Sequence, residues 1–539
     1  MADTAAVASE VTPAEHKRLR MALVLISLAQ LMVVLDSTIA NIALPFIGAD
    51  LDIEQANLSW IVTGYALTFG GFLLLGGRLA DLFGRRRIFI TGVLVFAVAS
   101  LIGGFAQNEV MLLGARGFQG LGAAMASPAA LALITTTFPA GKERNRAFAV
   151  YAAMAGVGAA VGLILGGWLT GLDPMLGLEG WRYTFLIVVP IGITAALMAP
   201  RYFEESERHS GELDIPGAIT GTGGLLAIVY GLSRAGDSRY GFDDGTTILS
   251  LVVGLLLLGI FLLIESRVQH PLMPFRIFLS KNRAAAFAVM MIVPAAMFAM
   301  FFFLSLFIQL VVGYSPLHTG VAFLPFSVAM IFSAITASKL IGHVDPRYLS
   351  GIGTLLSATA LYGFSRITVP EDPGSILAAL PTAMGGQGIS LGGDVNYWTQ
   401  ILPFIVLMAF GMGLNFVPLT LVAVHHLRVQ DTGIGSGVLN TMQQVGGALG
   451  LATLSTVSLH FAGDRAAELT PSIAAAAPDL PPEALGFLAN IGSFTEGATM
   501  AFFVGSIMMI AASAIVWLFL DVKHEELATE AAPEGVVVH

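Results

Sequence analysis

Long runs of apolar residues dominate the chain and are separated by short polar segments. Each run is long enough to cross a hydrocarbon core of about 30 Å as a helix that rises about 1.5 Å per residue. The pattern predicts fourteen transmembrane helices, of which the first six lie at 21–46, 58–79, 88–106, 110–138, 147–170 and 182–200. Two central helices follow at 216–233 and 247–266, and a last six at 284–312, 317–341, 347–366, 399–425, 434–461 and 498–521.

The composition agrees with a chain that faces lipid. Of the 539 residues, 56% are hydrophobic and 12% are charged. A soluble domain carries roughly 25% charged residues, because most of its surface contacts water. The absence of Cys excludes disulfides, thiolate metal sites and Cys nucleophiles. No basic tract indicates a nucleic-acid partner, although the net charge is −10.

The distribution of Lys and Arg predicts the orientation in the membrane. Twenty of the 26 basic residues lie in the tails and alternate connections that share the side of the N-terminus. Arg116 lies inside a predicted helix, and the opposite connections hold only Arg182, Arg234, Arg239, Arg366 and Arg465. Basic residues are enriched in cytoplasmic loops. We therefore expect a multi-pass protein of the cell (inner) membrane with both termini in the cytoplasm.

A faint internal repeat divides the chain. The segment from Gly77 to Arg87 has a degraded counterpart from Ser338 to Arg347, each between the second and third helix of a six-helix group. Duplicated halves with a substrate site between them are typical of transporters. The expected fold is an all-α integral membrane protein made of two six-helix bundles plus two additional central helices. The expected regions are an N-terminal tail 1–20, a first bundle 21–200, a linker with the extra helices 201–283, a second bundle 284–521 and a C-terminal tail 522–539.

Two connections on the outer side are long, at about 367–398 and 462–497. The second is rich in Ala and Pro and is expected to be a partly ordered loop. The first contains Gly385-Gly386-Gln387-Gly388 and Gly392-Gly393-Asp394, but no strand precedes it and no helix begins at it, so a nucleotide site is not expected. The ten His are scattered, and no metal or nucleophile constellation indicates an enzyme. No ring of charges indicates a channel.

Four motifs resemble those of the major facilitator superfamily, specifically its fourteen-helix drug:proton antiporters. The segment from Gly77 to Arg87 is similar to the loop motif shared across that superfamily, and Leu35 to Pro45 to the motif of its fourteen-helix branch. Two further matches run from Arg116 to Gly122 and from Gly158 to Gly167. In the last of these, Leu163 stands where the family motif usually has Pro, a departure that bears on the coupling assignment because this motif is associated with antiporters.

The resemblance implies the major facilitator fold and a function. It implies proton-coupled efflux of hydrophobic or cationic small molecules, such as drugs or antibiotics, by alternating access. The alternative is an exporter or flippase of a lipid or another amphiphile. The expected partners are a small-molecule substrate, protons and membrane lipids, with no cofactor, no metal and a monomeric chain.

Asp36 and Arg116 are the candidates for proton coupling. Asp36 lies about fifteen residues into the first helix, where a carboxylate costs several kcal/mol unless it is paired, wetted or protonated. Arg116 lies at a similar depth on the fourth helix, and the resemblance implies that both line a central cavity. The structural alternatives are a carboxylate held by Ser37 or Asn41 and an arginine that reaches the outer interface.

The loop after the second helix is the candidate conformational latch, formed by Gly77, Asp81, Gly84 and Arg85. The resemblance implies that Asp81 lies near Ser436 at the start of a helix of the second bundle. There a carboxylate stabilises the positive end of the helix by about 0.3–1 kcal/mol. Gly158, Gly162, Gly166 and Gly167 are expected to leave a flat helix face for close packing.

The substrate is expected to bind between the two bundles. Polar candidates are combined with Met and Phe, because these make adaptable apolar pockets and aromatic rings attract cations. The candidate substrate residues are Thr63, Tyr65, Gln119, Met297, Phe298, Phe301, Phe302, Asn415, Asn440, Gln443 and Gln444.

Overall fold

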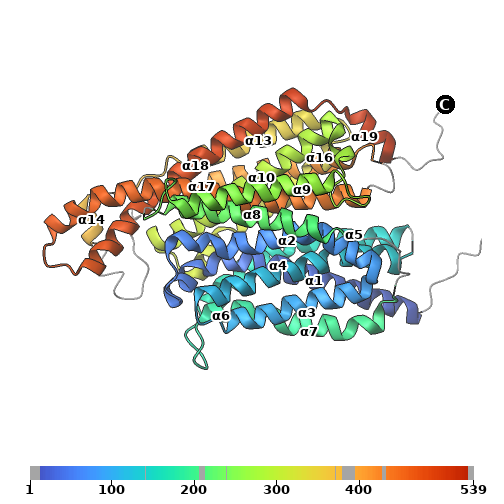
Figure 1. Ribbon diagram of the computed structural model, residues 1–539, viewed down its shortest axis with the longest axis horizontal. Coiled ribbons are helices and arrows are strands. Elements are labelled where there is room, and N and C mark those ends of the chain that lie inside the picture. The colour runs from blue at the N-terminus through green and yellow to red at the C-terminus, as the bar shows by residue number, and fades with distance from the viewer. Residues whose placement is uncertain are drawn as a thin grey trace, which may run out of the picture.

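The computed structural model describes residues 13–139, 141–205, 213–237, 239–370, 372–378, 395–427 and 432–531. Figure 1 shows the helices running along the long axis of the molecule in two bundles, coloured blue to cyan and yellow to red. The first bundle consists of α1 (Pro13–Asp50), α2 (Gln55–Phe83), α3 (Arg85–Gly104), α4 (Glu109–Thr137), α5 (Lys142–Thr170), α6 (Gly180–Leu186) and α7 (Val188–Tyr202).

Two central helices, α8 (Ile215–Gly236) and α9 (Gly245–Glu265), connect the bundles. The second bundle begins with the short η1 (Phe275–Leu279). It continues through α10 (Lys281–Leu306), η2 (Phe307–Val311), α11 (Pro316–Ala322), α12 (Leu324–Leu340), α13 (Pro346–Phe364), α14 (Pro373–Ala378), η3 (Tyr397–Ile401), α16 (Leu402–Val424), α17 (Thr432–Ala476), α18 (Pro482–Phe519) and α19 (His524–Ala531).

The prediction of fourteen transmembrane helices is confirmed. Within the described residues, thirteen spans are long and apolar enough to cross a membrane, counting α6 with α7 and α11 with α12 as single spans. The fourteenth is α13, a helix of 19 residues with buried Ser350, Thr354 and Ser357. Two of these hydroxyls are satisfied, because Thr354 and Ser357 donate to backbone carbonyls one turn earlier in the same helix.

The prediction of a partly ordered loop at 462–497 is wrong. Helix α17 continues to Ala476 and α18 begins at Pro482, so nearly all of this connection is a helical hairpin. With 45 residues, α17 is about 68 Å long and extends well beyond a hydrocarbon core of about 30 Å. The hairpin projects at the left of Figure 1 and packs against α14, where Ile376 is fully buried. Segment 385–394 of the other long connection lies outside the described residues.

The buried cores show how the bundles meet. We call the end where α1 begins and α18 finishes the terminal end. Near it, the core of the first bundle contains only residues between Leu19 and Phe203. At the opposite end, residues such as Ile47 and Trp181 share one core with the second bundle. The two bundles are therefore joined at the opposite end and have separate cores toward the terminal end.

Helix α8 packs across the seam between the bundles, against both α2 and α17. Ser233 donates a hydrogen bond to the carbonyl of Ala56 at 3.3 Å, and Thr456 donates to the carbonyl of Leu232 at 2.7 Å. Helix α9 packs mainly on α8 and leaves large apolar side chains exposed, such as Leu255 and Leu256. The central pair thus adds a wall to the seam.

Candidate functional site

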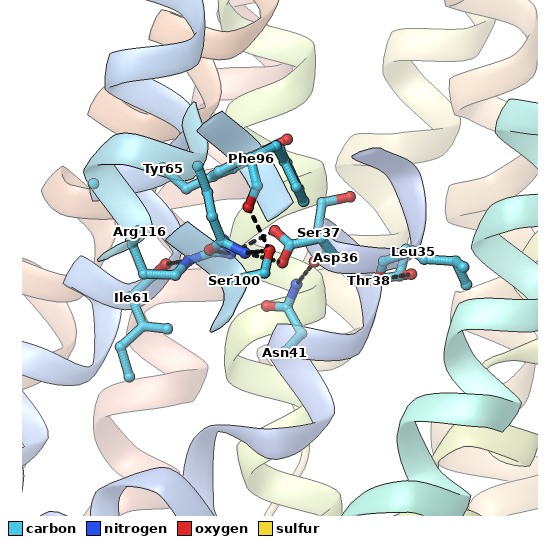
Figure 2. A network of polar contacts seen from close by, with 12 residues as sticks. Leu35, Asp36, Ser37, Thr38, Asn41, Ile61, Tyr65, Phe96, Ser100 and Arg116 are labelled. Carbon is cyan, nitrogen blue, oxygen red and sulfur yellow. Dashed lines mark hydrogen bonds and ion pairs between the residues drawn. The ribbon is translucent and has the colours of Figure 1, made fainter. Parts of the chain in front are cut away.

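A buried ion pair joins α1 to α4. Arg116 Nη1 lies 2.5 Å from Asp36 Oδ2, and the two side chains are 1% and 3% exposed. Both sequence candidates for proton coupling are thus in direct contact (Figure 2). Ser37 and Asn41 do not hold the carboxylate, because their described hydrogen bonds go to the backbone of α1 itself. Arg116 is buried and paired instead of extending to an interface.

Gln119 connects the pair to a third helix. Its amide nitrogen donates to Asp36 Oδ1 and to the hydroxyl of Ser100 on α3, both at 2.8 Å, while its amide oxygen accepts from Arg116 at 2.8 Å. Ser100 in turn donates to the carbonyl of Phe96 at 2.8 Å. Both carboxylate oxygens of Asp36 are therefore bound. Gln119, expected in a substrate site, belongs to this polar network.

Arg116 is held by backbone and aromatic contacts as well. Its Nε donates to the carbonyl of Ile61 on α2 at 2.7 Å. Its guanidinium lies 4.5 Å from the ring centre of Tyr65 and 6.0 Å from that of Phe185. A cation over an aromatic face is stabilised by the ring quadrupole, more strongly where water is excluded. Groups from α1, α2, α4 and α6 thus surround one guanidinium. Removal of its counter-ion would leave an unpaired buried charge, which is strongly destabilising.

The location of the pair differs from the expectation drawn from the resemblance. We expected Asp36 and Arg116 to line a cavity between the bundles, whereas they are enclosed within the first bundle by α1, α2, α3, α4 and α6. The reason is that Gln119 and the carbonyl of Ile61 provide hydrogen bonds that cavity water would otherwise supply, so the buried pair keeps its polar partners without water. Ser100 was missed from the sequence because a lone Ser in an apolar helix carries no distinctive signal.

The loop after α2 makes its described contacts within the first bundle. Asp81 Oδ1 accepts from Arg85 at 3.3 Å, and the described contacts do not join Asp81 to Ser436. Gly84 has a φ of 103°, and a side chain there would meet the carboxylate of Glu205. Arg86 and Arg87 lie 3.6 and 3.5 Å from that carboxylate. Gly77 lies beside Pro128 of α4. The latch role stays a prediction.

The candidate glycines of α5 face α1 and α11. A Cβ at Gly158 or Gly166 would lie about 3 Å from Val34 or Ile39, and one at Gly162 would overlap the hydroxyl of Thr38. Gly167 approaches the backbone of Pro316 on α11 in the same way. Leu163 stands at the position where the family motif has Pro. Its carbonyl oxygen lies so close to Gly320 that it would overlap a Cβ at that position.

The substrate candidates do not gather in one place. Thr63 and Tyr65 are buried in the first bundle, and Asn415 is buried in the second, where its amide donates to Gly411. Phe301 packs on Phe323 and Phe326, and Phe302 on Phe303, while Met297 and Phe298 are partly buried.

The candidates on α17 lie nearer the seam. Gln444 packs against Gly70 of α2, Gln443 donates to the sulfur of Met290, and the exposed Asn440 donates to Ser436 of its own helix. Their role in substrate binding stays a prediction.

A second polar cluster lies between the bundles and was missed from the sequence. Ser305 on α10 donates to the carbonyl of Asn41 at 3.1 Å, and Gln309 donates to the hydroxyl of Ser305 at 3.0 Å. The side-chain oxygens of Asn41 and Gln309 are buried and have no partner in the described structure. Because Asn41 lies five residues beyond Asp36 on α1, one helix connects the ion pair to this contact across the seam.

No group of three or more His, Asp or Glu side chains that could hold a metal ion occurs among the described residues. The candidate site therefore consists of the ion pair, its amide and hydroxyl partners, and the contact between the bundles. This arrangement offers one buried carboxylate whose two oxygens are both bound by side chains of another helix.

Comparisons with known proteins place these features in a family. The model of the Major Facilitator Superfamily matches residues 26–451. The puromycin resistance protein pur8 of Streptomyces alboniger is 38% identical over 522 residues, covering 95% of this chain and 92% of that protein. The cephamycin export protein CmcT of Amycolatopsis lactamdurans is 36% identical over 453 residues, covering 83% and 87%.

A solved structure has the same fold at low identity. It is a bacterial homologue of the human lysosomal transporter Spinster in an inward-facing, unoccupied conformation, with a TM-score of 0.65 and 17% identity. The match covers 96% of this chain and 99% of that chain.

Proposed function

Because the chain belongs to the Major Facilitator Superfamily, we propose that it exports hydrophobic or cationic small molecules from the cell in exchange for protons. The observation that carries the proposal is the buried pair of Asp36 and Arg116, a titratable carboxylate enclosed at membrane depth. Intramembrane ionisable residues are functional by default. The substrate class is supported by two relatives, named for puromycin resistance and for cephamycin export.

The network supports a simple coupling step. A proton that binds Asp36 neutralises the carboxylate and removes its attraction to Arg116. Arg116 then retains the carbonyl of Ile61 and the amide oxygen of Gln119, so that its charge is still solvated by dipoles. With the pair released, α1 is free to shift against α4. Because α1 also carries Asn41, such a shift reaches the contact with Ser305 on α10.

The proposed cycle is alternating access with the terminal end in the cytoplasm. The two bundles share a core at the opposite end, where α5 and α11 approach closely, and have separate cores toward the terminal end. In this orientation the structure corresponds to an inward-facing state. Opening to the outside requires the contacts of Gly167 with Pro316 and of Asn41 with Ser305 to break.

Export of a lipid or another amphiphile is the second candidate function. It is supported by a groove between α1 and α5 whose walls are mostly apolar. A transported amphiphile and a transported drug differ in the compound that drives proton release, so one assay separates them.

Substrate-driven proton release tests the proposed function. Purified protein in proteoliposomes with an imposed pH gradient should accumulate a cationic dye such as ethidium, and addition of dye should release protons. A pH difference of about one unit supplies about 1.4 kcal/mol per proton, which supports a roughly tenfold gradient at one proton per substrate. If cationic and neutral drugs leave proton flux unchanged while a lysolipid drives it, the amphiphile function replaces the drug function.

Reporter fusions test the orientation. A periplasmic phosphatase reporter inserted after Asp479, in the turn between α17 and α18, should be active because that turn is expected outside the cell. The same reporter fused after Lys523 should be inactive. Activity at Lys523 together with inactivity at Asp479 would reverse the proposed orientation.

A further inference from the structure

A groove of about 670 Å³ lies between α1 and α5 toward the terminal end. The helices are in close contact where Gly158 and Gly162 of α5 meet α1, and the groove lies on the terminal side of this contact. On α1 it is lined at helical spacing by Leu19, Leu23, Val24, Ser27, Leu28 and Leu31. Val150 and Met154 of α5 form part of the facing wall, and Val24 is 46% exposed. The part of the groove farther from the terminal end is therefore an apolar slot.

The charged residues of the groove lie at its terminal end, where Arg20 projects from α1 and Arg146 from α5. Within the described structure, neither guanidinium has a hydrogen bond or an ion pair. Two other titratable groups line the groove, His16 and Glu143, and they pair with each other at 3.8 Å. The mouth therefore carries a net positive charge that its own residues do not neutralise.

A third feature lies deeper in the groove. The hydroxyl of Ser27 is buried and has no hydrogen-bond partner in the described structure, and the residue is 9% exposed. A buried hydroxyl without a partner costs free energy. A ligand with an oxygen along its chain, such as an ester carbonyl, would satisfy it.

The length of the groove matches one leaflet of a membrane. From Arg20 to Leu31 the helix rises about 17 Å at 1.5 Å per residue. Half of a hydrocarbon core is about 15 Å. These features together match a diacyl lipid with an anionic headgroup. The basic side chains lie at one end of the groove, the apolar slot extends from them over the length of a leaflet, and the hydroxyl without a partner lies on the wall of the slot.

We propose that the groove between α1 and α5 binds an anionic phospholipid of the leaflet at the terminal end. Arg20 and Arg146 bind the phosphate from the two walls, and an acyl chain fills the slot beside Leu23, Leu28 and Met154. This inference concerns a resident lipid and does not depend on which compound is exported.

Titration with defined lipids tests the site. Native mass spectrometry of the full-length protein gives the Kd for phosphatidylglycerol and for phosphatidylcholine of identical acyl chains. Wild-type protein should prefer phosphatidylglycerol. Arg20→Gln and Arg146→Gln should each weaken phosphatidylglycerol binding about fivefold, and the double variant about twenty-five-fold, with little change for phosphatidylcholine.

Three further variants test whether the lipid preference depends on the charges of Arg20 and Arg146 and on the slot. Arg201→Gln removes an exposed arginine from the end of α7 and should leave the preference unchanged. The double variant Arg20→Lys with Arg146→Lys should restore most of the preference, because the charge is retained. Val24→Trp fills the slot from an exposed position and should weaken the binding of both lipids.

Two outcomes would overturn the assignment. One is a double Gln variant that keeps the phosphatidylglycerol preference within twofold of Arg201→Gln. The other is a transported compound that displaces the lipid and loses its own binding in the double Gln variant, which would make the groove a substrate site. Proton-driven transport is measured separately, so a chain that proves not to export drugs leaves the lipid result intact.

Discussion

Replacing Asp36 by Asn should abolish proton-driven export. Asn has the shape of Asp but cannot alternate between a neutral and a charged form. Its side chain can still accept a hydrogen bond from Arg116, so substrate binding should persist for at least some neutral compounds. In proteoliposomes with a pH difference of about one unit, the roughly tenfold substrate gradient expected per exchanged proton should fall to about one. Proton release on substrate addition should fall to the level of empty vesicles.

The matched control for this variant is Asp50→Asn. Asp50 also lies on α1 and also pairs with an arginine, Arg182 at 2.7 Å, but at the end of the helix where its side chain is 27% exposed. Its replacement should leave coupling intact. Wild-type-like substrate gradients in Asp36→Asn would exclude this carboxylate as the proton carrier.

Stability must be measured with coupling, because breaking a buried pair typically costs about 3–5 kcal/mol. Asp36→Asn should therefore lower the Tm. The decrease should be smaller than if Arg116 lost all its partners, because Arg116 keeps its hydrogen bonds to Ile61 and Gln119. The double variant Asp36→Asn with Arg116→Gln removes the uncompensated charge and should recover part of the Tm. It should not recover coupling, which separates folding from proton transfer.

Replacing Arg116 by Gln should move the pH dependence of transport upward. The guanidinium at 2.5 Å favours the charged carboxylate of Asp36. Without it the neutral form is favoured, so protonation requires a lower proton concentration and therefore occurs at higher pH. The midpoint of substrate-induced proton release, measured between about pH 5 and 9, should therefore rise.

Arg116→Lys is the control for charge. Lys keeps the positive charge but lacks the guanidinium fork that binds Asp36, Gln119 and Ile61 together. Its pH midpoint should stay nearer to wild type than that of Arg116→Gln, while its Tm should fall. A pH profile that is the same in wild type and Arg116→Gln would leave Arg116 a structural residue and would not affect the assignment of Asp36.

The two variants also test where the coupling lies. Because the pair is enclosed within the first bundle, protonation acts on contacts among α1, α3 and α4 before it acts on the seam. A cavity-facing carboxylate would bind substrate directly, so its loss would weaken affinity. If the pair acts inside one bundle, Asp36→Asn should lose proton coupling and keep most of its affinity for substrate.

The sequence alone determined the fold class and the spans. Apolar runs of helical length leave few alternatives in lipid, because each backbone polar group must be satisfied within its own segment. The same rule made Asp36 and Arg116 conspicuous, and their depths along α1 and α4 predicted that they could meet. The turn between α17 and α18 shows where the prediction from sequence failed. Pro481 and Pro482 were interpreted as loop residues, but they stand at the start of α18, where Pro is compatible with a helix.

Only the tertiary structure decided which side of each helix faces what. Gln119 was predicted in a substrate site and instead joins Asp36 to Ser100, while Asn41 meets Ser305 and Gln309 across the seam. The physical reason is that a membrane helix is apolar on nearly every side, so hydrophobic periodicity does not mark its buried face as it does in water. Which polar side chains meet is then set by close packing and by the need to pair each one, and these depend on the neighbouring helices.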